Sequence, residues 1–229
     1  RLGMTYEEGL SSDVRVVYRD PATQQLHIGF RGTASLGDVV TDVQMGANVF
    51  DSRFTGELDA FNEQIAPWLA ENPGYTATMQ GHSLGGAVTS YMNYQLRADA
   101  LVTHATSFNA ATSSVGNLMT DLFTEGYTAG PPLNAAGEPA FNYIDRMRNV
   151  VQKGDAVSAD VNVAKAQPYG DTWTYDNVQE RGMLGSHSLN TFTNPIWFEE
   201  WNSGYKPLVQ VADTVLEGFR QGATEFVQK

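Results

Sequence analysis

The sequence predicts an α/β fold, with a central, mostly parallel sheet and helices on both of its faces. Three observations predict this class. Short apolar segments of strand type alternate with amphipathic helical ones, a glycine-rich turn joins one buried strand directly to a helix, and no repeat or low-complexity tract divides the chain. The 229 residues are enough for one such domain with a sizeable core. We therefore expect a single domain over residues 1–229.

The chain opens with a predicted hairpin that is followed by a helix. Apolar residues dominate 14–19 and 26–31, and the turn of residues 20–23 between them carries a proline. Residues 57–71 have helical spacing, with an apolar face formed by Leu58, Phe61, Ile65, Trp68 and Leu69. Pro67 should kink this helix or restart it, because proline removes a backbone donor.

The rest of the chain continues the alternation. We expect strands over residues 75–80, 104–109 and 149–152, a β-like centre in 161–184, and helices over 87–97 and 208–227. The β-like centre is aromatic, at Trp173 and Tyr175. Residues 113–140 are rich in Gly, Pro, Thr and Asn, which predicts a helical turn near 115–123 and then a long surface loop.

Composition and charge exclude several classes of function. Hydrophobic residues make up 41% of the chain and charged residues 17%, as in soluble globular proteins, and no apolar run is long enough for a transmembrane segment. The net charge of −12 argues against a nucleic-acid partner, because no basic patch would offset the phosphates. The absence of cysteine excludes disulfides, thiol catalysis and cysteine metal sites.

The location and the oligomeric state stay open. No signal-peptide pattern opens the chain, and we expect a soluble protein that is either secreted or cytoplasmic. Because the first residue is Arg1 rather than Met, we expect a processed product or an excised piece.

Gly81-His82-Ser83-Leu84-Gly85 is the most informative segment of the sequence. A predicted strand precedes it and a predicted helix follows it, which is the context that a nucleophile elbow requires. Such a turn holds a serine hydroxyl at the tip of a strand, where a histidine can reach it and a backbone amide can meet the oxyanion. The segment therefore predicts Ser83 as a nucleophile.

A base is needed beside Ser83, and the chain has only four histidines: His27, His82, His104 and His187. The order nucleophile, acid, histidine favours His187, which follows the elbow in a loop-like Gly185-Ser186-His187-Ser188 segment. His82 adjoins the nucleophile, so the turn points it away from the hydroxyl. The other two histidines are better interpreted as ordinary strand or surface residues.

The predicted acid is Asp155. It directly follows the strand predicted over 149–152, so its carboxylate should lie at the carboxyl edge of the sheet, where catalytic groups of open α/β sheets gather. Asp160 and Asp145 are the nearest alternatives.

Four segments together resemble the class 3 lipases, the family of the fungal triacylglycerol lipases. They are Gly29-Phe30-Arg31-Gly32-Thr33, the elbow through Gly86, Asn149 to Asp155, and Gly185-Ser186-His187. They occur in the family's order between Val14 and His187. The resemblance implies an α/β-hydrolase-like single domain with a short lid segment.

The resemblance also implies roles for individual residues. Ser83 would be the nucleophile, Asp155 the acid and His187 the base. Thr33 would serve the oxyanion through its amide and hydroxyl, and Leu84 would supply the second amide.

Residues around the predicted site match the family less fully. Asp42 falls where the family often has an aspartate that holds the oxyanion hydroxyl. The lid would be a short amphipathic helix with apolar residues Leu36, Val39, Val40 and Val43, which could equally pack on the core. The family's His-x-Gly-Phe segment, its Phe-Gly-x-Pro-Arg strand end and its long N-terminal helix are absent; Phe54-Thr55-Gly56 and Phe108-Asn109-Ala110-Ala111-Thr112 stand in the first two places.

The sequence thus predicts a serine carboxylic-ester hydrolase of lipase or phospholipase type, with no metal and no cofactor. Its substrate would be a lipid or other ester, in solution or at a lipid–water interface. The alternatives are a soluble-substrate esterase, thioesterase or acyltransferase with the same triad, and a non-catalytic module that retains the fold.

Overall fold

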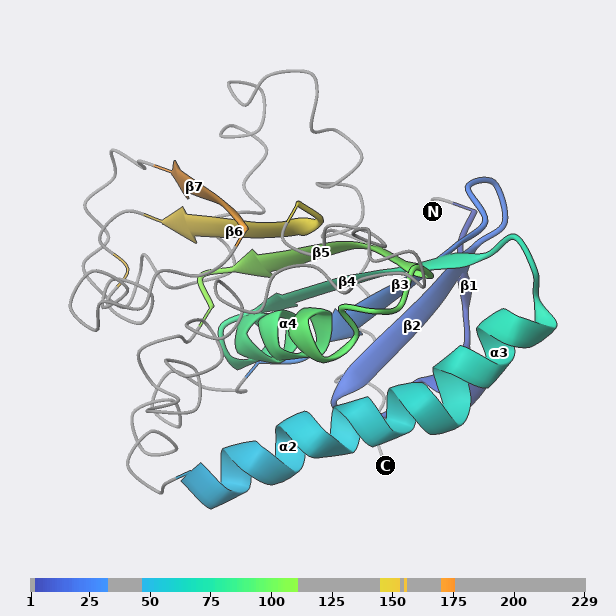
Figure 1. Ribbon diagram of the computed structural model, residues 1–229, viewed down its shortest axis with the longest axis horizontal. Helices are drawn as coiled ribbons and strands as arrows, with labels where there is room; N and C mark the ends of the chain where they lie inside the picture. Colours follow the sequence, from blue (N-terminus) through green and yellow to red (C-terminus); the bar gives the residue numbers. More distant parts are fainter. Residues whose placement is uncertain (1–2, 33–46, 111–144, 153–154, 156–169, 176–229) are drawn as a thin grey trace, which may run out of the picture.

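The computed structural model describes residues 3–32, 47–110, 145–152, 155 and 170–175 (Figure 1). These residues build a seven-stranded sheet in which the order of the strands in space is their order along the chain. The strands are β1 (Thr5–Tyr6), β2 (Arg15–Asp20), β3 (Gln25–Phe30), β4 (Thr76–His82), β5 (Val102–Phe108), β6 (Met147–Gln152) and β7 (Asp171–Tyr175). β1, β2 and β3 pair antiparallel, and every pair from β3 to β7 is parallel. The predicted mostly parallel sheet is therefore confirmed.

The hairpin of β2 and β3 opens the main body of the sheet as predicted. Its register pairs Arg15 with Phe30 and Asp20 with Gln25. In the turn, the Asp20 carboxylate accepts hydrogen bonds from the Ala22 amide at 2.9 Å and the Thr23 hydroxyl at 2.8 Å. These bonds fix a tight connection, so the strand register is set locally.

Residues 47–71, between β3 and β4, form one continuous helical segment. It consists of α2 (Ala47–Ala60), a π-helical turn η2 (Phe61–Ile65) and α3 (Ala66–Glu71). Pro67 occupies the first turn of α3, and because it has no N–H, the hydrogen-bond ladder changes just before it. The helix begins at Ala47 rather than at the predicted Glu57, and the buried Phe54 lies one helical turn before Leu58.

The helix α4 (Leu84–Gln95) starts directly after the predicted elbow and packs on β3, β4 and β5, while α2 packs on α4 (Figure 1). Its start at Leu84 is earlier than the predicted Ala87. The rings of Phe54 in α2 and Tyr91 in α4 lie 5.2 Å apart between centroids. α2 and α4 therefore share one apolar core with the sheet.

The two faces of the sheet differ in chemistry. Leu26, Ile28 and Met79 belong to the apolar core that the helices cover. Alternate residues point to the opposite face, where His27 and Thr78 are polar and yet buried. Burial on both faces fits a sheet that is covered on both sides.

The predicted helices at 208–227 and 115–123 lie outside the described residues. No helix among the residues that the structure describes is both long and apolar enough to cross a membrane.

Candidate active site

Ser83 lies alone between the last residue of β4, His82, and the first residue of α4, Leu84. Its backbone has φ 57° and ψ −123°, a conformation that non-glycine residues rarely adopt. Backbone strain of this kind costs on the order of 1–3 kcal/mol and persists only where the surroundings enforce it. The serine is also buried, with 3% of its surface exposed. The local geometry is that of a strand–turn–helix elbow.

Glycines make this turn possible. A Cβ on Gly81 would overlap the Gly85 carbonyl, and a Cβ on Gly85 would overlap the Phe30 carbonyl. A Cβ on Gly32 would lie 2.7 Å from the His82 oxygen. The end of β3 therefore rests directly against the elbow, with no room for a side chain between the two backbones.

Hydrogen bonds attach the elbow to its surroundings. The Ser83 amide donates to the Phe108 carbonyl at the end of β5, at 3.0 Å, and the Ser83 carbonyl accepts from the Ala87 amide at 3.1 Å. Leu84 is the first residue of α4, so its amide belongs to the group of helix donors without an intrahelical acceptor. That amide is available, in chemical terms, to an anion above the helix N-terminus.

Asp155 lies just after β6 and is completely buried. Its amide donates to the carbonyl of Gln152, the last residue of the strand, at 3.1 Å. Because β4 and β6 flank β5 in parallel, Ser83 and Asp155 both follow strand ends at the carboxyl edge of the sheet. A buried carboxylate at this edge needs polar partners, which is typical of an orienting acid.

A family model for class 3 lipases matches residues 27–159, which is more than half of the chain. The chain belongs to the class 3 lipases. The matched residues of this class 3 lipase extend from β3 past Asp155, so they include the elbow and exclude His187.

Solved structures of fungal lipases resemble this class 3 lipase. Lip2 lipase from Yarrowia lipolytica is 16% identical, with a TM-score of 0.47, and the match covers 76% of this chain and 65% of that one. Rhizomucor miehei lipase is 15% identical, with a TM-score of 0.48 and coverage of 75% and 56%. A triacylglycerol lipase from Penicillium expansum is 17% identical, with a TM-score of 0.42 and coverage of 76% and 71%. The chain thus spans less than two thirds of the length of Lip2 and Rhizomucor lipase. No curated protein matches its sequence at a significant level.

The alternative acid Asp145 lies at the other end of β6. It is exposed and precedes the first residue of that strand, at the sheet edge opposite Ser83. Asp160 lies outside the described residues, as do Thr33, Asp42, His187 and the lid residues Leu36, Val39, Val40 and Val43. In this class 3 lipase the structure thus gives the positions of Ser83, Leu84 and Asp155.

Two of the remaining histidines lie within strands, His27 in β3 and His104 in β5. The His27 Nδ1 lies 2.9 Å from the Thr78 hydroxyl, and burial lowers the pKa of His27 below its ordinary value. Its Nε2 is buried and forms no hydrogen bond with the described residues, so a proton there would be unpaired. His82 ends β4, next to the elbow. Among the described residues, no cluster of His, Asp or Glu could hold a metal ion.

Asn109 is a residue of the site that sequence reasoning noticed only as a departure from the family pattern. It is fully buried with φ 42°, and its amide donates to the Val150 carbonyl at 2.8 Å. Its side-chain oxygen accepts the Gln152 amide at 2.7 Å. The signal in the sequence was an asparagine as the last residue of a predicted buried strand, because asparagine tolerates positive φ.

Proposed function

We propose that this class 3 lipase is a serine carboxylic-ester hydrolase of lipase or phospholipase type, which cleaves acyl esters of lipids through an acyl-enzyme on Ser83. The observation that carries the proposal is the strained, buried backbone of Ser83 at the junction of β4 and α4. Strain at this position would serve catalysis, because the strained turn presents the Ser83 hydroxyl at the end of β4 to a base and to the N-terminus of α4 at the same time.

In the proposed reaction, the Ser83 hydroxyl attacks the carbonyl carbon of the ester. His187 accepts the proton of that hydroxyl and then donates it to the oxygen of the leaving alcohol. Asp155 holds the imidazole in the productive tautomer and stabilises its charged form. In the second half of the cycle His187 deprotonates a water, which attacks the acyl carbon; the bond to the Ser83 oxygen breaks, His187 returns the proton to that oxygen, and the carboxylic acid leaves. Neither a metal ion nor a cofactor takes part.

The oxyanion of each tetrahedral intermediate would be stabilised by the Leu84 amide and by the amide and hydroxyl of Thr33. The position of Leu84 at the start of α4 supports its part, because the helix dipole favours negative charge there. A donor of this kind is worth about 3 kcal/mol in the transition state. Asp42 would hold the Thr33 hydroxyl in place.

The proposed substrate is a lipid ester at a lipid–water interface. Leu36, Val39, Val40 and Val43 would form the apolar face of a short lid over the acyl-binding groove. In water this face would cover the groove, and at a lipid surface it would gain an apolar partner. A soluble-substrate esterase would need no such cover.

Labelling and an ester panel test the proposal. A fluorophosphonate should label the wild type and should fail to label Ser83→Ala. p-Nitrophenyl esters of graded chain length should be hydrolysed, with a rise in rate when long-chain ester exceeds its solubility. Equal labelling of both proteins would reject the mechanism, and a flat rate across the solubility limit would favour a soluble-substrate esterase.

A further inference from the structure

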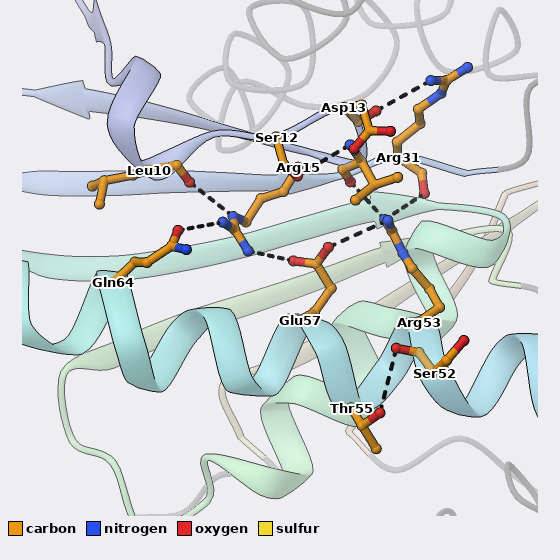
Figure 2. Close-up of polar contacts among 11 residues, drawn as sticks. Leu10, Ser12, Asp13, Arg15, Arg31, Ser52, Arg53, Thr55, Glu57 and Gln64 are labelled. Carbon is orange, nitrogen blue, oxygen red and sulfur yellow. Dashed lines mark hydrogen bonds and ion pairs between the residues drawn. The ribbon is translucent and has the colours of Figure 1, made fainter.

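A buried ion network joins helix α2 to the first strands of the sheet (Figure 2). The Arg15 Nη1 in β2 lies 2.8 Å from the Glu57 Oε2, and both side chains are only 4% exposed. The other Glu57 oxygen lies 3.4 Å from the Arg53 Nη1, one helical turn earlier. Glu57 therefore lies between two arginines: it accepts a hydrogen bond from Arg15 and forms a longer ion pair with Arg53, whose Nε and Nη1 make no hydrogen bond with the described residues.

Arg15 is further fixed by neutral partners. Its Nε donates to the Leu10 carbonyl at 2.9 Å, and its Nη2 donates to the Gln64 side chain at 3.0 Å. With Glu57, these bonds leave the Arg15 guanidinium little freedom to move. The rigid end of the network is thus anchored in β2 and η2, and the Arg53 end extends toward β3 (Figure 2).

Arg53 contacts the backbone where β3 ends. Its Nη2 donates to the Val14 carbonyl at 2.7 Å and lies 3.4 Å from the Arg31 carbonyl, a longer and weaker contact. The same Val14 oxygen accepts the Arg31 amide at 3.0 Å. The Arg53 Nη2 thus contacts two carbonyl oxygens: that of Val14, which also accepts the Arg31 amide, and that of Arg31 itself.

That stretch of backbone is the one against which the elbow packs. A Cβ on Gly85 would lie 3.0 Å from the Arg31 carbonyl carbon, and a Cβ on Gly32 would lie 3.4 Å from the Ser83 Cβ. A shift of Arg31 or Gly32 by a few tenths of an ångström is therefore passed to the elbow, because no flexible side chain lies between them.

Stability alone does not explain this network. Burying an ion pair costs desolvation that the attraction only partly offsets, so an apolar pair of similar volume would often stabilise as well. Burial lowers the pKa of Arg53, while the Glu57 and Asp13 carboxylates oppose that shift. Unlike an apolar pair, the Arg53 guanidinium donates hydrogen bonds with a fixed direction, and these bonds set the positions of the Val14 and Arg31 carbonyl groups.

We infer that Arg53, held by Glu57, is a positioning residue for ester hydrolysis, which fixes the Phe30–Gly32 backbone against the Ser83 elbow. It touches no substrate. It acts by keeping Ser83 and the Leu84 amide in the geometry that the transition state requires. The inference rests on the proposed function of Ser83.

The test compares Arg53→Gln and Arg53→Lys with a control at a second arginine, which is more deeply buried than Arg53. Arg146 serves as the control, because its guanidinium donates to Asn93, Leu96, Asp99 and Val102 at the far end of α4, on the sheet edge opposite the elbow. The variant Arg146→Lys perturbs a buried network without touching the β3 end. For each protein we would measure kcat and KM on a soluble p-nitrophenyl ester, the rate of fluorophosphonate labelling, and Tm.

We expect Arg53→Gln to lower kcat and the labelling rate by about ten- to a hundredfold with KM nearly unchanged, as for a small misplacement of reacting groups. Arg53→Lys should recover part of kcat and stay about three- to tenfold below wild type, because its ammonium can still reach the Val14 oxygen. Arg146→Lys should lower Tm and keep kcat within about twofold.

The inference is overturned if the Arg53 variants lose no more kcat than Arg146→Lys does, or if KM changes as much as kcat. If Arg53→Gln does not fold, the two lysine variants decide between the outcomes by the same comparison. Failure of the proposed function is a separate result: in that case Ser83→Ala would keep wild-type hydrolysis, whatever the Arg53 variants do.

Discussion

The side-chain oxygen of Asn109 accepts a hydrogen bond from the backbone amide of Gln152, at 2.7 Å. Asn109 follows β5, whose last carbonyl holds the Ser83 amide, and Gln152 ends β6 and holds the Asp155 amide. One asparagine therefore stands in the chain of bonds between the proposed nucleophile and the proposed acid. Removing it should disturb the spacing of the two residues.

We predict that Asn109→Ala lowers both stability and kcat. The buried Gln152 amide would lose this hydrogen bond, and a lost bond of this kind costs about 1–3 kcal/mol. The matched control is Asn149→Ala, which loses a buried bond from the Ser107 hydroxyl at 2.8 Å within the same pair of strands. The control should lose stability with much less effect on kcat. Equal effects on kcat would show that Asn109 is structural only.

Substitution of Ser83 should separate activity from stability. Ser83→Ala should lower kcat by at least about a thousandfold, as expected for a lost nucleophile. Ser83→Gly should be just as inactive and yet more stable than Ser83→Ala by about 1–3 kcal/mol, because glycine adopts φ 57° without strain. Denaturant unfolding of the two variants measures the difference. An alanine variant as stable as the glycine variant would mean that the turn is not strained.

Aspartate variants test the identity of the acid. Asp155→Asn should lower kcat about as severely as other losses from a triad, on the order of 10⁴-fold. His187→Ala should be nearly as damaging as Ser83→Ala, whereas Asp160→Asn and the exposed Asp145→Asn should be mild. Steady-state kinetics on a soluble ester would rank them. A severe Asp160→Asn beside a mild Asp155→Asn would move the acid to Asp160.

The proposed lid can be tested by charge. The double variant Val39→Asp, Val40→Asp should reduce hydrolysis of emulsified long-chain ester, because two carboxylates would oppose contact of the lid with lipid. Hydrolysis of a dissolved short-chain ester should stay within about threefold, since the triad is untouched. If both activities fall together with Tm, the valines belong to the core. If neither falls, the segment is a passive loop and a soluble-substrate esterase becomes the better interpretation.

Burial of His27 predicts acid sensitivity. Its folded pKa lies below the ordinary value of 6.5, mainly because burial disfavours the charged ring, although Asp20 partly opposes this. Below pH 6.5 the unfolded chain therefore binds more protons than the folded one, so stability falls as the pH falls. His27→Asn, which keeps a polar atom near Thr78, should show a smaller loss of Tm between pH 7 and 5. Parallel pH curves for the two proteins would contradict this account.

Local patterns made most of the described part of the fold predictable. The hairpin and the buried strands have short apolar runs between turn residues, and each was expected within a few residues of its bounds in the structure. The elbow was predictable because its residues are contiguous in the sequence, although Gly85 is also required by the close approach of the Phe30 carbonyl in β3. Burial of Asp155 after β6 was consistent with its place in the sequence, since a parallel strand carries the next residue to a known edge.

Long-range partners could not be predicted in this way. Arg15 and Glu57 are 42 residues apart, and no pattern in either segment predicts that the two side chains form an ion pair. The contact of Arg53 in α2 with the Val14 carbonyl likewise joins segments that are far apart in the sequence. The hydrogen bond of the Asn109 side chain to Gln152 also depends on the pairing of β5 with β6, which the sequence does not specify.

The agreement between strand order and chain order has a consequence for synthesis. Each strand from β2 to β7 pairs with the strand made just before it, so a chain leaving the ribosome can extend its sheet one edge at a time. β4 and its elbow would be paired on both sides before Asp155, which follows β6, has been translated. A nascent chain would thus contain a completed serine turn while its proposed acid is still to be made. If Asp155 is the acid, the proposed hydrolase would be inactive at that stage of synthesis.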